Sequence, residues 1–511
     1  MTMLNFIDNL LNRITMYRLV LYFLIFLLII ATTLSFLNLL PYSSLAIILS
    51  TLFILFVCWI TNIIFAKFFD ATTNVESVYI TALILALIIT PMLSIADLGF
   101  FSLASWASVW AIASKYVFAV RRKHIFNPAA FGVALTALTI NQSASWWVGT
   151  AYLLPFVVIG GLLIVKKIRR FDLFLSFIVV SLIAITVPHI FTGGGLWPVL
   201  YAAVINSPVV FFATVMLTEP LTTPPRRAGR ASYGGLVGFL FSPSIHLGGI
   251  YSTPELSLLA GNIFSYLISP KDKFVLKFKE KIKVASGVYD FLFKTEVPMV
   301  FLPGQYLEWT LGQAKSDSRG NRRYFTIASS PTEKDLRLGI KFYNNPSSFK
   351  KDMLFMNKST SIVASQLAGD FVMPKDKSKK LVFIAGGIGV TPFRSMVKYL
   401  LDKNERRSIT IFYSNRSASD IAYRETFEKA KIQLGINVVY TLTDNNNIPS
   451  DWRGERGLVD NEMIAKYVPD FRERIFYLSG PRSMVTVFDR KLKELGVSRF
   501  KIKKDYFPGF A

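Results

Sequence analysis

The first 270 residues carry about ten apolar segments, and this feature constrains the fold more than any other. Each approaches the roughly 20 residues that a helix needs to cross a hydrocarbon core about 30 Å thick. Only structures that satisfy their own backbone hydrogen bonds can span lipid, so the pattern predicts a polytopic α-helical membrane domain. The segments are 17–37, 44–65, 77–91, 99–120, 128–140, 147–165, 171–190, 197–217, 233–241 and 255–268.

Basic residues are concentrated in alternate loops, and the loops between them carry almost no Lys or Arg. The positive-inside rule then predicts a multi-pass protein of the cell membrane, with both termini and the C-terminal domain in the cytoplasm. The first apolar segment is too long for a signal-peptide core, so we expect it to be a membrane span. The basic loop residues are Arg13, Arg18, Lys67, Arg121, Arg122, Lys123, Lys166, Lys167, Arg169, Arg170, Arg226, Arg227, Arg230, Lys271 and Lys273.

Composition excludes several classes of protein. The formal net charge of +24 first suggests nucleic-acid binding, but the basic residues flank apolar segments, as in membrane proteins, so no nucleic-acid partner is expected. Cys58 is the one cysteine, which excludes an intrachain disulfide, a Cys-rich zinc site and a cysteine-ligated iron–sulfur cluster within one chain. We therefore predict no metal site.

The chain changes character near residue 270, and three domains are expected. Residues 1–270 form the membrane domain. Residues 271–378 carry short alternating runs, which predict the antiparallel strands of a β-barrel. In residues 379–511 strands alternate with helices, which predicts an α/β nucleotide-binding domain with a parallel sheet.

Four motifs follow one another in the second half: PGQY at 303–306, RYFT at 323–326, GGIGVTP at 386–392 and SGPRSMV at 479–485. Together with DYFPGF at 505–510, they resemble the ferredoxin–NADP reductase superfamily over residues 271–511. The resemblance implies an FAD-dependent NAD(P)H reductase, with FAD on the barrel and NADH or NADPH on the α/β domain.

The resemblance also implies roles for single residues. An arginine offers a planar, permanently charged donor to the FAD pyrophosphate, and Gly-rich backbone at a helix N-terminus binds the NAD(P)H pyrophosphate. Ser479 stands where the family often has a cysteine. The implied FAD contacts are Arg323, Tyr324, Phe325, Thr326, Ser347, Ser348 and Phe510, with Phe507 and Phe510 either shielding the flavin or packing in the core. The implied NAD(P)H contacts are Gly386, Gly387, Gly389, Thr391, Pro392, Arg416, Gly480 and Pro481. The implied catalytic residues are Thr326, Thr391 and Ser479.

The choice between NADH and NADPH stays open. Arg416 and Arg424 follow the second parallel strand, where the adenosine ribose is recognised, and either arginine is able to bind a 2′-phosphate there. Both are equally well explained as solvated surface arginines.

Two stretches of the first half, HIFNPAAFG at 124–132 and FFATVMLTEPLTTPPRRAGR at 211–230, carry a second resemblance. They resemble the family of the B subunit of the sodium-translocating NADH:quinone reductase and the D subunit of the Rnf complex, with Glu219 in place of the usual aspartate. This implies a membrane flavin, FMN or riboflavin. The candidate contacts are Asn127, Thr218, Glu219, Thr222, Ser145 and Thr150. Alternatively, these prolines and arginines simply end and anchor helices.

The expected function is electron transfer from NAD(P)H through FAD to a membrane-domain cofactor, and then to a quinone or an extracytoplasmic acceptor, with partner electron-transfer subunits as an option. Two bis-histidine haems are excluded because the chain has three histidines. Two alternatives stay open: a redox-driven ion transporter, and a reductase merely tethered to the membrane.

Overall fold

The computed structural model describes residues 11, 14–69, 75–120, 123–191, 195–269, 274–295, 299–312 and 321–505. The chain divides into two compact units, Met1–Asp272 and Lys273–Ala511. Each unit has its own hydrophobic core, and each is described by itself below.

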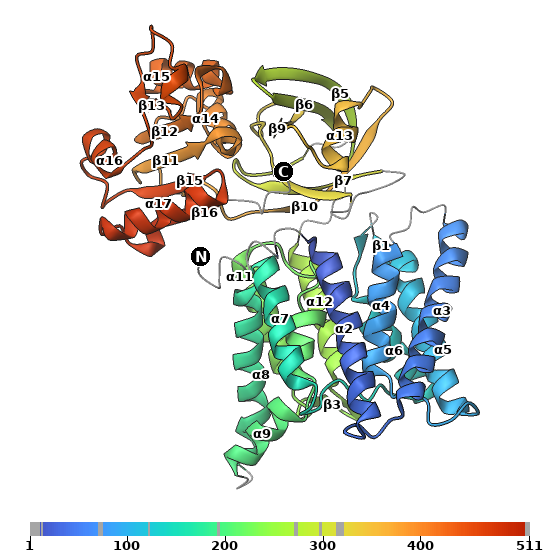
Figure 1. Cartoon of the computed structure of the whole chain (residues 1–511). Helices are drawn as coiled ribbons and strands as arrows, with labels where there is room; N and C mark the ends of the chain where they lie inside the picture. Colours follow the sequence, from blue (N-terminus) through green and yellow to red (C-terminus); the bar gives the residue numbers. More distant parts are fainter. Residues whose placement is uncertain are drawn as a thin grey trace. The chain divides into compact units, whose positions relative to one another are not determined.

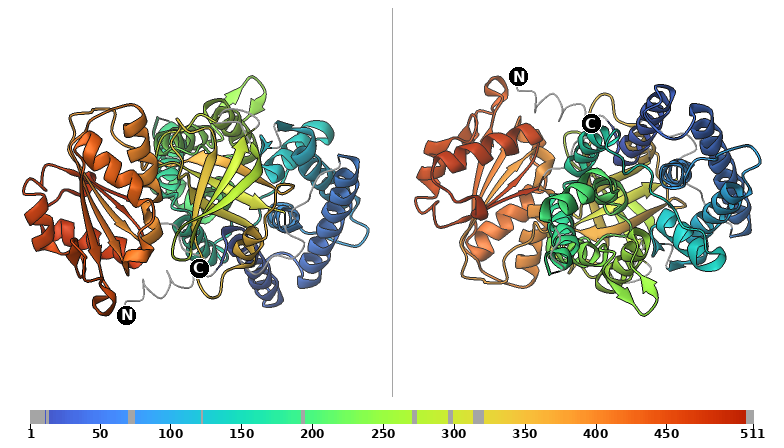
Figure 2. Two further views of the ribbon diagram at one scale, coloured as in Figure 1. Left: turned by 90° about the horizontal axis from the view of Figure 1, so that it is seen from above. Right: turned by 90° about the horizontal axis from the view of Figure 1, so that it is seen from below.

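The first unit is helical, and its longer helices lie side by side (Figure 1, Figure 2). Its helices are α2 (Met16–Phe36), α3 (Ser44–Phe68), α4 (Val75–Ile88), α5 (Leu98–Val117), α6 (Pro128–Ile140), α7 (Leu154–Ile168), α8 (Phe171–Phe191), α9 (Leu196–Ile205), α10 (Val209–Phe211), the π-helix η1 (Phe212–Met216), α11 (Arg227–Leu240) and α12 (Pro254–Ile268). Two antiparallel pairs of two-residue strands join β1 (Ala119–Val120) to β2 (Lys123–His124) and β3 (His246–Leu247) to β4 (Ile250–Tyr251).

The described residues contain three helices long and apolar enough to cross a membrane, which are α2, α3 and α8, and a fourth span if the bent pair Leu196–Ile205 and Val209–Met216 counts as one. The expectation of about ten spans is therefore corrected. A helix lies at each expected segment, but several are short. Asn127 caps α6 at its start and Asn141, in the left-handed conformation, ends it after 13 residues. At α6, local backbone and capping geometry, rather than apolar composition, sets where the helix starts and stops.

Close helix packing in this unit depends on small residues. Gly234 and Gly238 lie four residues apart on α11 and face α8, where a Cβ added at either glycine would come within 2.7 Å of the carbonyl oxygen of Leu173 or Phe177. Small residues at this spacing let two helix backbones approach closely, which is the usual way that helices associate in lipid.

The second unit begins with a six-stranded antiparallel sheet in the order β8-β7-β10-β5-β6-β9. Alternate side chains point into one apolar core that contains Trp309 and Phe293, as expected for strands with one buried face. The strands are β5 (Phe274–Ala285), β6 (Val288–Thr295), β7 (Tyr306–Leu311), β8 (Arg322–Thr326), β9 (Leu336–Lys341) and β10 (Ser361–Ala368), with helix α13 (Ser348–Leu354) between the last two.

A parallel six-stranded sheet follows, in the order β14-β13-β12-β11-β15-β16. Along β11, Leu381 and Phe383 pack in a core with α14 and α15, while Val382 and Ile384 pack in a second core with α16 and α17. The sheet thus has helices on both faces (Figure 1). Its elements are β11 (Leu381–Gly386), α14 (Thr391–Asp402), β12 (Ile409–Asn415), α15 (Arg424–Leu434), β13 (Asn437–Leu442), β14 (Glu455–Arg456), α16 (Asn461–Tyr467), β15 (Ile475–Ser479), α17 (Arg482–Glu494) and β16 (Ile502–Asp505).

The two sheets of this unit are joined by buried hydrogen bonds. Arg394 Nη1 on α14 donates to the Ala328 carbonyl at 3.0 Å, and the Ser395 hydroxyl donates to the Ser329 carbonyl at 2.6 Å. Arg394 also forms an ion pair with Glu333. These contacts hold the end of the first sheet against the start of α14.

Candidate functional site

The parallel sheet reverses its strand order at β11, and this is where an open α/β sheet ordinarily binds its ligand. Strands β12 and β13 lie on one side of β11, and β15 and β16 lie on the other. Ala385 pairs with Ser479, and Ser479 pairs with Asp505. The predicted residues Gly386 and Ser479 therefore meet at the carboxyl edge of the sheet, at its topological switch point.

The two glycine motifs of the second half lie in contact there. A Cβ added at Gly389 would come within 2.5 Å of Gly480 Cα, so the two turns pack backbone against backbone. Gly387 has a φ of 52°, a conformation that glycine adopts without strain. Pro481 precedes α17, and Thr391 and Pro392 begin α14. This edge therefore presents bare backbone and a helix start, as pyrophosphate binding requires.

On β8 the predicted FAD residues lie next to one another. Arg323 is buried, with its guanidinium 5.3 Å from the centre of the Phe349 ring, and the Phe325 ring lies 6.0 Å from the same ring. The Tyr324 hydroxyl donates to Glu308 Oε2 at 2.7 Å. The Phe349 ring thus holds the arginine against the sheet.

The remaining predicted FAD residues have mixed outcomes. Ser347 is buried and its hydroxyl accepts the Lys350 N–H at 3.4 Å, so it caps α13, which begins at Ser348. Their contact with a phosphate stays a prediction. Phe507 and Phe510 lie outside the described residues.

Thr326 has a partner that sequence reasoning missed. Its hydroxyl donates to Asp505 Oδ2 at 3.3 Å, across 179 residues, and Asp505 is the register neighbour of Ser479. The predicted catalytic residues Thr326 and Ser479 therefore both lie beside Asp505. The one local signal was the acid at the start of the terminal DYFPGF motif.

The donor set of this unit fits FAD and a nicotinamide nucleotide. Arg323 is a buried cation on the barrel, the Gly389–Gly480 contact leaves a backbone cradle at the sheet edge, and Thr326 connects the two through Asp505. A buried guanidinium and the backbone N–H groups at a helix start both favour phosphate oxygens.

In the first unit the structure joins three of the predicted membrane-site residues, Asn127, Glu219 and Thr222. Asn127 Nδ2 donates to Glu219 Oε2 at 2.9 Å, and His124 Nε2 lies 3.2 Å from Glu219 Oε1. The Thr222 hydroxyl lies 3.4 Å from Glu219 Oε2. In contrast, the Thr218 hydroxyl donates to the Thr214 carbonyl of its own helix, so Thr218 does not join this group.

Sequence reasoning missed two buried members of the same network. Asn262 Oδ1 accepts the Asn127 backbone N–H at 2.7 Å, and Asn262 Nδ2 lies 3.0 Å from the Tyr233 hydroxyl. Asn127 Oδ1 caps α6 through the Ala130 N–H. The described polar atoms of this network hydrogen-bond largely to one another, so the network locks the start of α6, and its contact with a flavin stays a prediction.

The loop after α6 forms a second polar region. The Thr90 hydroxyl donates to Ser145 Oγ at 2.7 Å, and Trp146 Nε1 donates to the buried Glu255 at 3.1 Å. Trp146 has a φ of 55°, which is strained for an aromatic residue. The Thr150 hydroxyl oxygen is buried without a hydrogen-bond partner among the described residues. This orphaned oxygen is a feature that fits an additional polar ligand.

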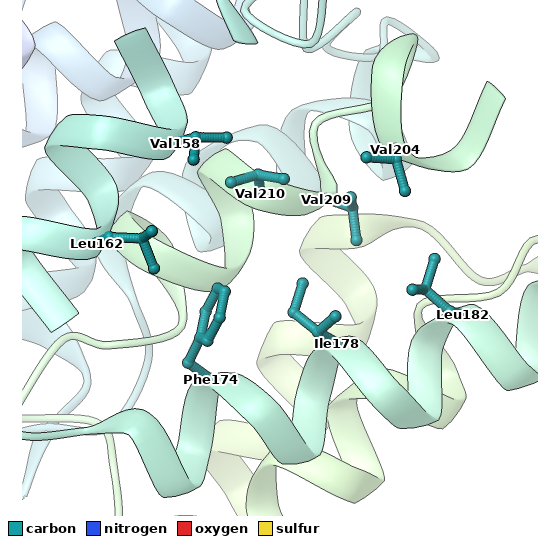
Figure 3. A pocket seen from close by; sticks show the side chains of 8 residues that line it. All are labelled: Val158, Leu162, Phe174, Ile178, Leu182, Val204, Val209 and Val210. Atoms are coloured by element: carbon teal, nitrogen blue, oxygen red, sulfur yellow. The ribbon is translucent and has the colours of Figure 1, made fainter. Parts of the chain in front are cut away.

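A cavity of about 150 Å³ lies at the bend between α9 and α10, and Figure 3 shows side chains of α7, α8 and the bent pair around it. All its lining side chains are apolar, so it has no side-chain group to orient a redox cofactor. The lining residues are Val158, Leu162, Phe174, Ile178, Leu182, Val204, Val209 and Val210.

Comparison with known proteins finds matches to the second unit. Residues 383–490 match the oxidoreductase NAD-binding domain family. The chain is 25% identical over 241 residues to a flavohemoprotein of Oceanobacillus iheyensis, covering 45% of this chain and 58% of the relative. It is 29% identical over 202 residues to the F subunit of the Na(+)-translocating NADH-quinone reductase of a Marinomonas species, covering 37% and 49%. The flavohem-like FAD/NAD-binding domain of a Vibrio cholerae nitric oxide dioxygenase aligns with a TM-score of 0.39 at 20% identity, covering 46% of this chain and 98% of that domain.

The second unit is similar to FAD/NAD-binding modules of the ferredoxin–NADP reductase type, and these matches indicate an FAD-dependent NAD(P)H oxidoreductase. The chain spans about half to two thirds of the length of the curated relatives that it matches. The expectations for the first unit go beyond these matches, which cover under half of the chain.

Proposed function

We propose that this protein is a membrane flavoenzyme that oxidises NADH or NADPH at its second unit and passes the electrons into its helical first unit. The observation that carries the proposal is the meeting of the two glycine turns, Gly389 against Gly480, at the switch point of the parallel sheet. Thr326 of the antiparallel sheet reaches the same edge through Asp505.

The residues of the second unit divide the work. FAD, when bound, supplies the acceptor for a hydride from the nicotinamide. Arg323 binds its pyrophosphate, and the backbone at Gly386–Gly389 binds that of the nucleotide. Thr326 orients the reacting edge by hydrogen bonding, and the buried Ser479 and Thr391 hold the nicotinamide side of the crevice.

The first unit is proposed to carry the electrons onward. FAD in a domain outside a hydrocarbon core about 30 Å thick needs a further carrier to reach the opposite face. We propose a second flavin that contacts the Thr150 hydroxyl, which is buried without a hydrogen-bond partner among the described residues. A quinone or an extracytoplasmic acceptor then receives the electrons. The similarity to a relative named as part of a Na(+)-translocating NADH-quinone reductase supports the quinone and the participation of partner subunits.

The test uses the full chain, purified in detergent with added FAD. We expect anaerobic NAD(P)H to bleach the flavin absorbance, and extraction to yield both FAD and a second flavin. The wild type should then reduce a water-soluble quinone faster than a Thr150→Val variant does. Both should reduce ferricyanide, which takes electrons at the second unit, at the same rate. If the wild-type preparation contains FAD alone and reduces quinone no faster than the variant, the membrane relay is refuted. The proposed reductase activity of the second unit is unaffected by that result.

A second candidate, redox-driven ion transport, is favoured by one observation. Glu255 on α12 is a carboxyl group within the helical first unit, and it is 3% exposed. Ionisable groups within apolar helical bundles ordinarily mark ion or proton pathways. Proteoliposomes that show NAD(P)H-driven uptake of a cation, abolished in Glu255→Gln, would select this candidate over simple electron transfer.

A further inference from the structure

Strands β12 and β13 end side by side at the edge that carries the glycine turn. The two segments that follow these strands also pair through their backbones. Thr443 N donates to the Asn415 carbonyl at 3.0 Å, and Asp444 N donates to the Arg416 carbonyl at 3.1 Å. The end of the second strand of such a sheet recognises the adenosine ribose. Asp444 is therefore held beside Arg416 at the ribose end of the nucleotide site.

The side chains of these two residues form an ion pair. Arg416 Nε lies 3.3 Å from Asp444 Oδ2, and the arginine side chain is 80% exposed against 16% for the aspartate. The carboxylate is fixed by two further donors, Asn446 N at 3.3 Å and Asn447 Nδ2 at 3.0 Å. The hydrogen bond from Asn447 is also the main cause that lowers the pKa of Asp444, so the group stays ionised at neutral pH.

The other charged groups near this edge have partners of their own. The Arg424 guanidinium lies 5.6 Å from the centre of the Tyr440 ring. Asp420 accepts hydrogen bonds from Ser417 and forms an ion pair with Lys341 at 3.1 Å. Arg416 therefore remains as the arginine to consider at the end of β12. The carboxylate of Asp444, which is held by Asn446 and Asn447, offsets its charge.

A 2′-phosphate and a ribose diol make opposite demands on this pair. The phosphate carries nearly two negative charges and needs a cation that is available to bind it. A neutral diol neither needs a cation nor is repelled by a carboxylate, and acidic residues are usual at the ribose end of NAD sites. We infer that Asp444, by neutralising Arg416 and repelling a 2′-phosphate, makes this site select NADH over NADPH. The inference rests on the proposed function and specifies its substrate.

The full-length protein with FAD provides the test, with ferricyanide as the acceptor. Wild type should have a higher kcat/KM for NADH than for NADPH. Asp444→Asn keeps an acceptor for Asn446 and Asn447 but removes the charge, so kcat/KM for NADPH should rise roughly fivefold, the scale of one exposed charge–charge interaction. The value for NADH should stay nearly constant. Asp376→Asn, a loss of one exposed charge before β11 at the opposite edge of the sheet, should change neither value.

A binding measurement separates recognition from turnover. Calorimetric titration of the same protein with 5′-AMP and with 2′,5′-ADP should show tighter binding of 5′-AMP, with the difference reduced in Asp444→Asn and enlarged in Arg416→Ala. The inference is overturned if the wild type prefers NADPH or binds 2′,5′-ADP more tightly than 5′-AMP. It is also overturned if Asp444→Asn changes kcat/KM for NADH and for NADPH by the same factor. If neither NADH nor NADPH reduces the flavin, the proposed function itself is refuted. This result differs from those that overturn the inference, so the two failures are distinguishable.

Discussion

Asn127 and Glu219, 92 residues apart in the chain, are joined by a hydrogen bond of 2.9 Å from the amide Nδ2 to the carboxylate Oε2. The same asparagine caps α6, and its backbone N–H donates to Asn262. One residue thus starts a short helix inside the apolar unit and ties it to two distant segments. Both asparagine and glutamate come from motifs that the sequence singled out.

The first prediction separates the two roles of Asn127. Asn127→Ala removes the helix cap and the Glu219 bond, and should destabilise the protein by about 1–2 kcal/mol. Asn127→Ser keeps a capping oxygen and should recover part of the loss. Thermal unfolding in detergent measures both, with the exposed Ser143→Ala as control. Equal stability of the alanine variant and wild type would contradict the structural role.

The second prediction concerns FAD retention. Arg323→Ala removes charge-assisted hydrogen bonds worth about 1.5–3 kcal/mol each, so FAD affinity should fall roughly tenfold or more. The neighbouring Arg322, whose guanidinium lies 3.7 Å from Glu308, provides the matched control Arg322→Ala. Fluorescence titration of the apoprotein with FAD compares the two. If both variants lose FAD equally, or neither does, Arg323 is not the pyrophosphate ligand.

The third prediction tests the contact between the two glycine turns. The methyl group of Gly389→Ala would meet Gly480 Cα at 2.5 Å, and overpacking of this kind costs about 1–3 kcal/mol. NAD(P)H-dependent flavin reduction should fall at least about tenfold while FAD stays bound. An alanine at Gly312 has nothing within 4 Å of its Cβ and is the control. A fully active Gly389→Ala variant would place the nucleotide elsewhere.

The fourth prediction is a pH dependence. Burial alone would raise the pKa of Asp470, but hydrogen bonds from Arg474 and Lys380 and their charges lower it to about 2. A lowered pKa in the folded state stabilises the protein above the ordinary aspartate value near 4, and this stabilisation disappears as the pH falls towards 2. Asp470→Asn should therefore destabilise the protein by about 1–2 kcal/mol at pH 7 and by roughly half as much at pH 3.

Urea unfolding at the two pH values, followed by FAD release, measures this difference. Asp451 is exposed, so Asp451→Asn serves as a charge control. A loss of stability in Asp470→Asn that is the same at both pH values would show that the ion pairs with Arg474 and Lys380 are not its cause.

The sequence predicted the second unit well because its signals are local. Alternating apolar residues indicate strands, and Gly386–Gly389 directly after an apolar strand indicates a phosphate-binding turn. The first unit was predicted less well. Apolar composition indicates helices, but their ends depend on capping and on pairing such as Trp146 N to the Ile88 carbonyl, so ten expected spans became three helices of spanning length in the described chain.

By itself, the sequence determined the apolar first half, the order of the four reductase motifs and the class of cofactor that they imply, since each depends on residues close together in the chain. Only the tertiary structure decided that Thr326 meets Asp505, that Asp444 neutralises Arg416 and that Asn262 supports Asn127. These partners lie 179, 28 and 135 residues apart. Such pairs form only when packed elements bring the side chains within hydrogen-bond distance, and no local pattern encodes that geometry.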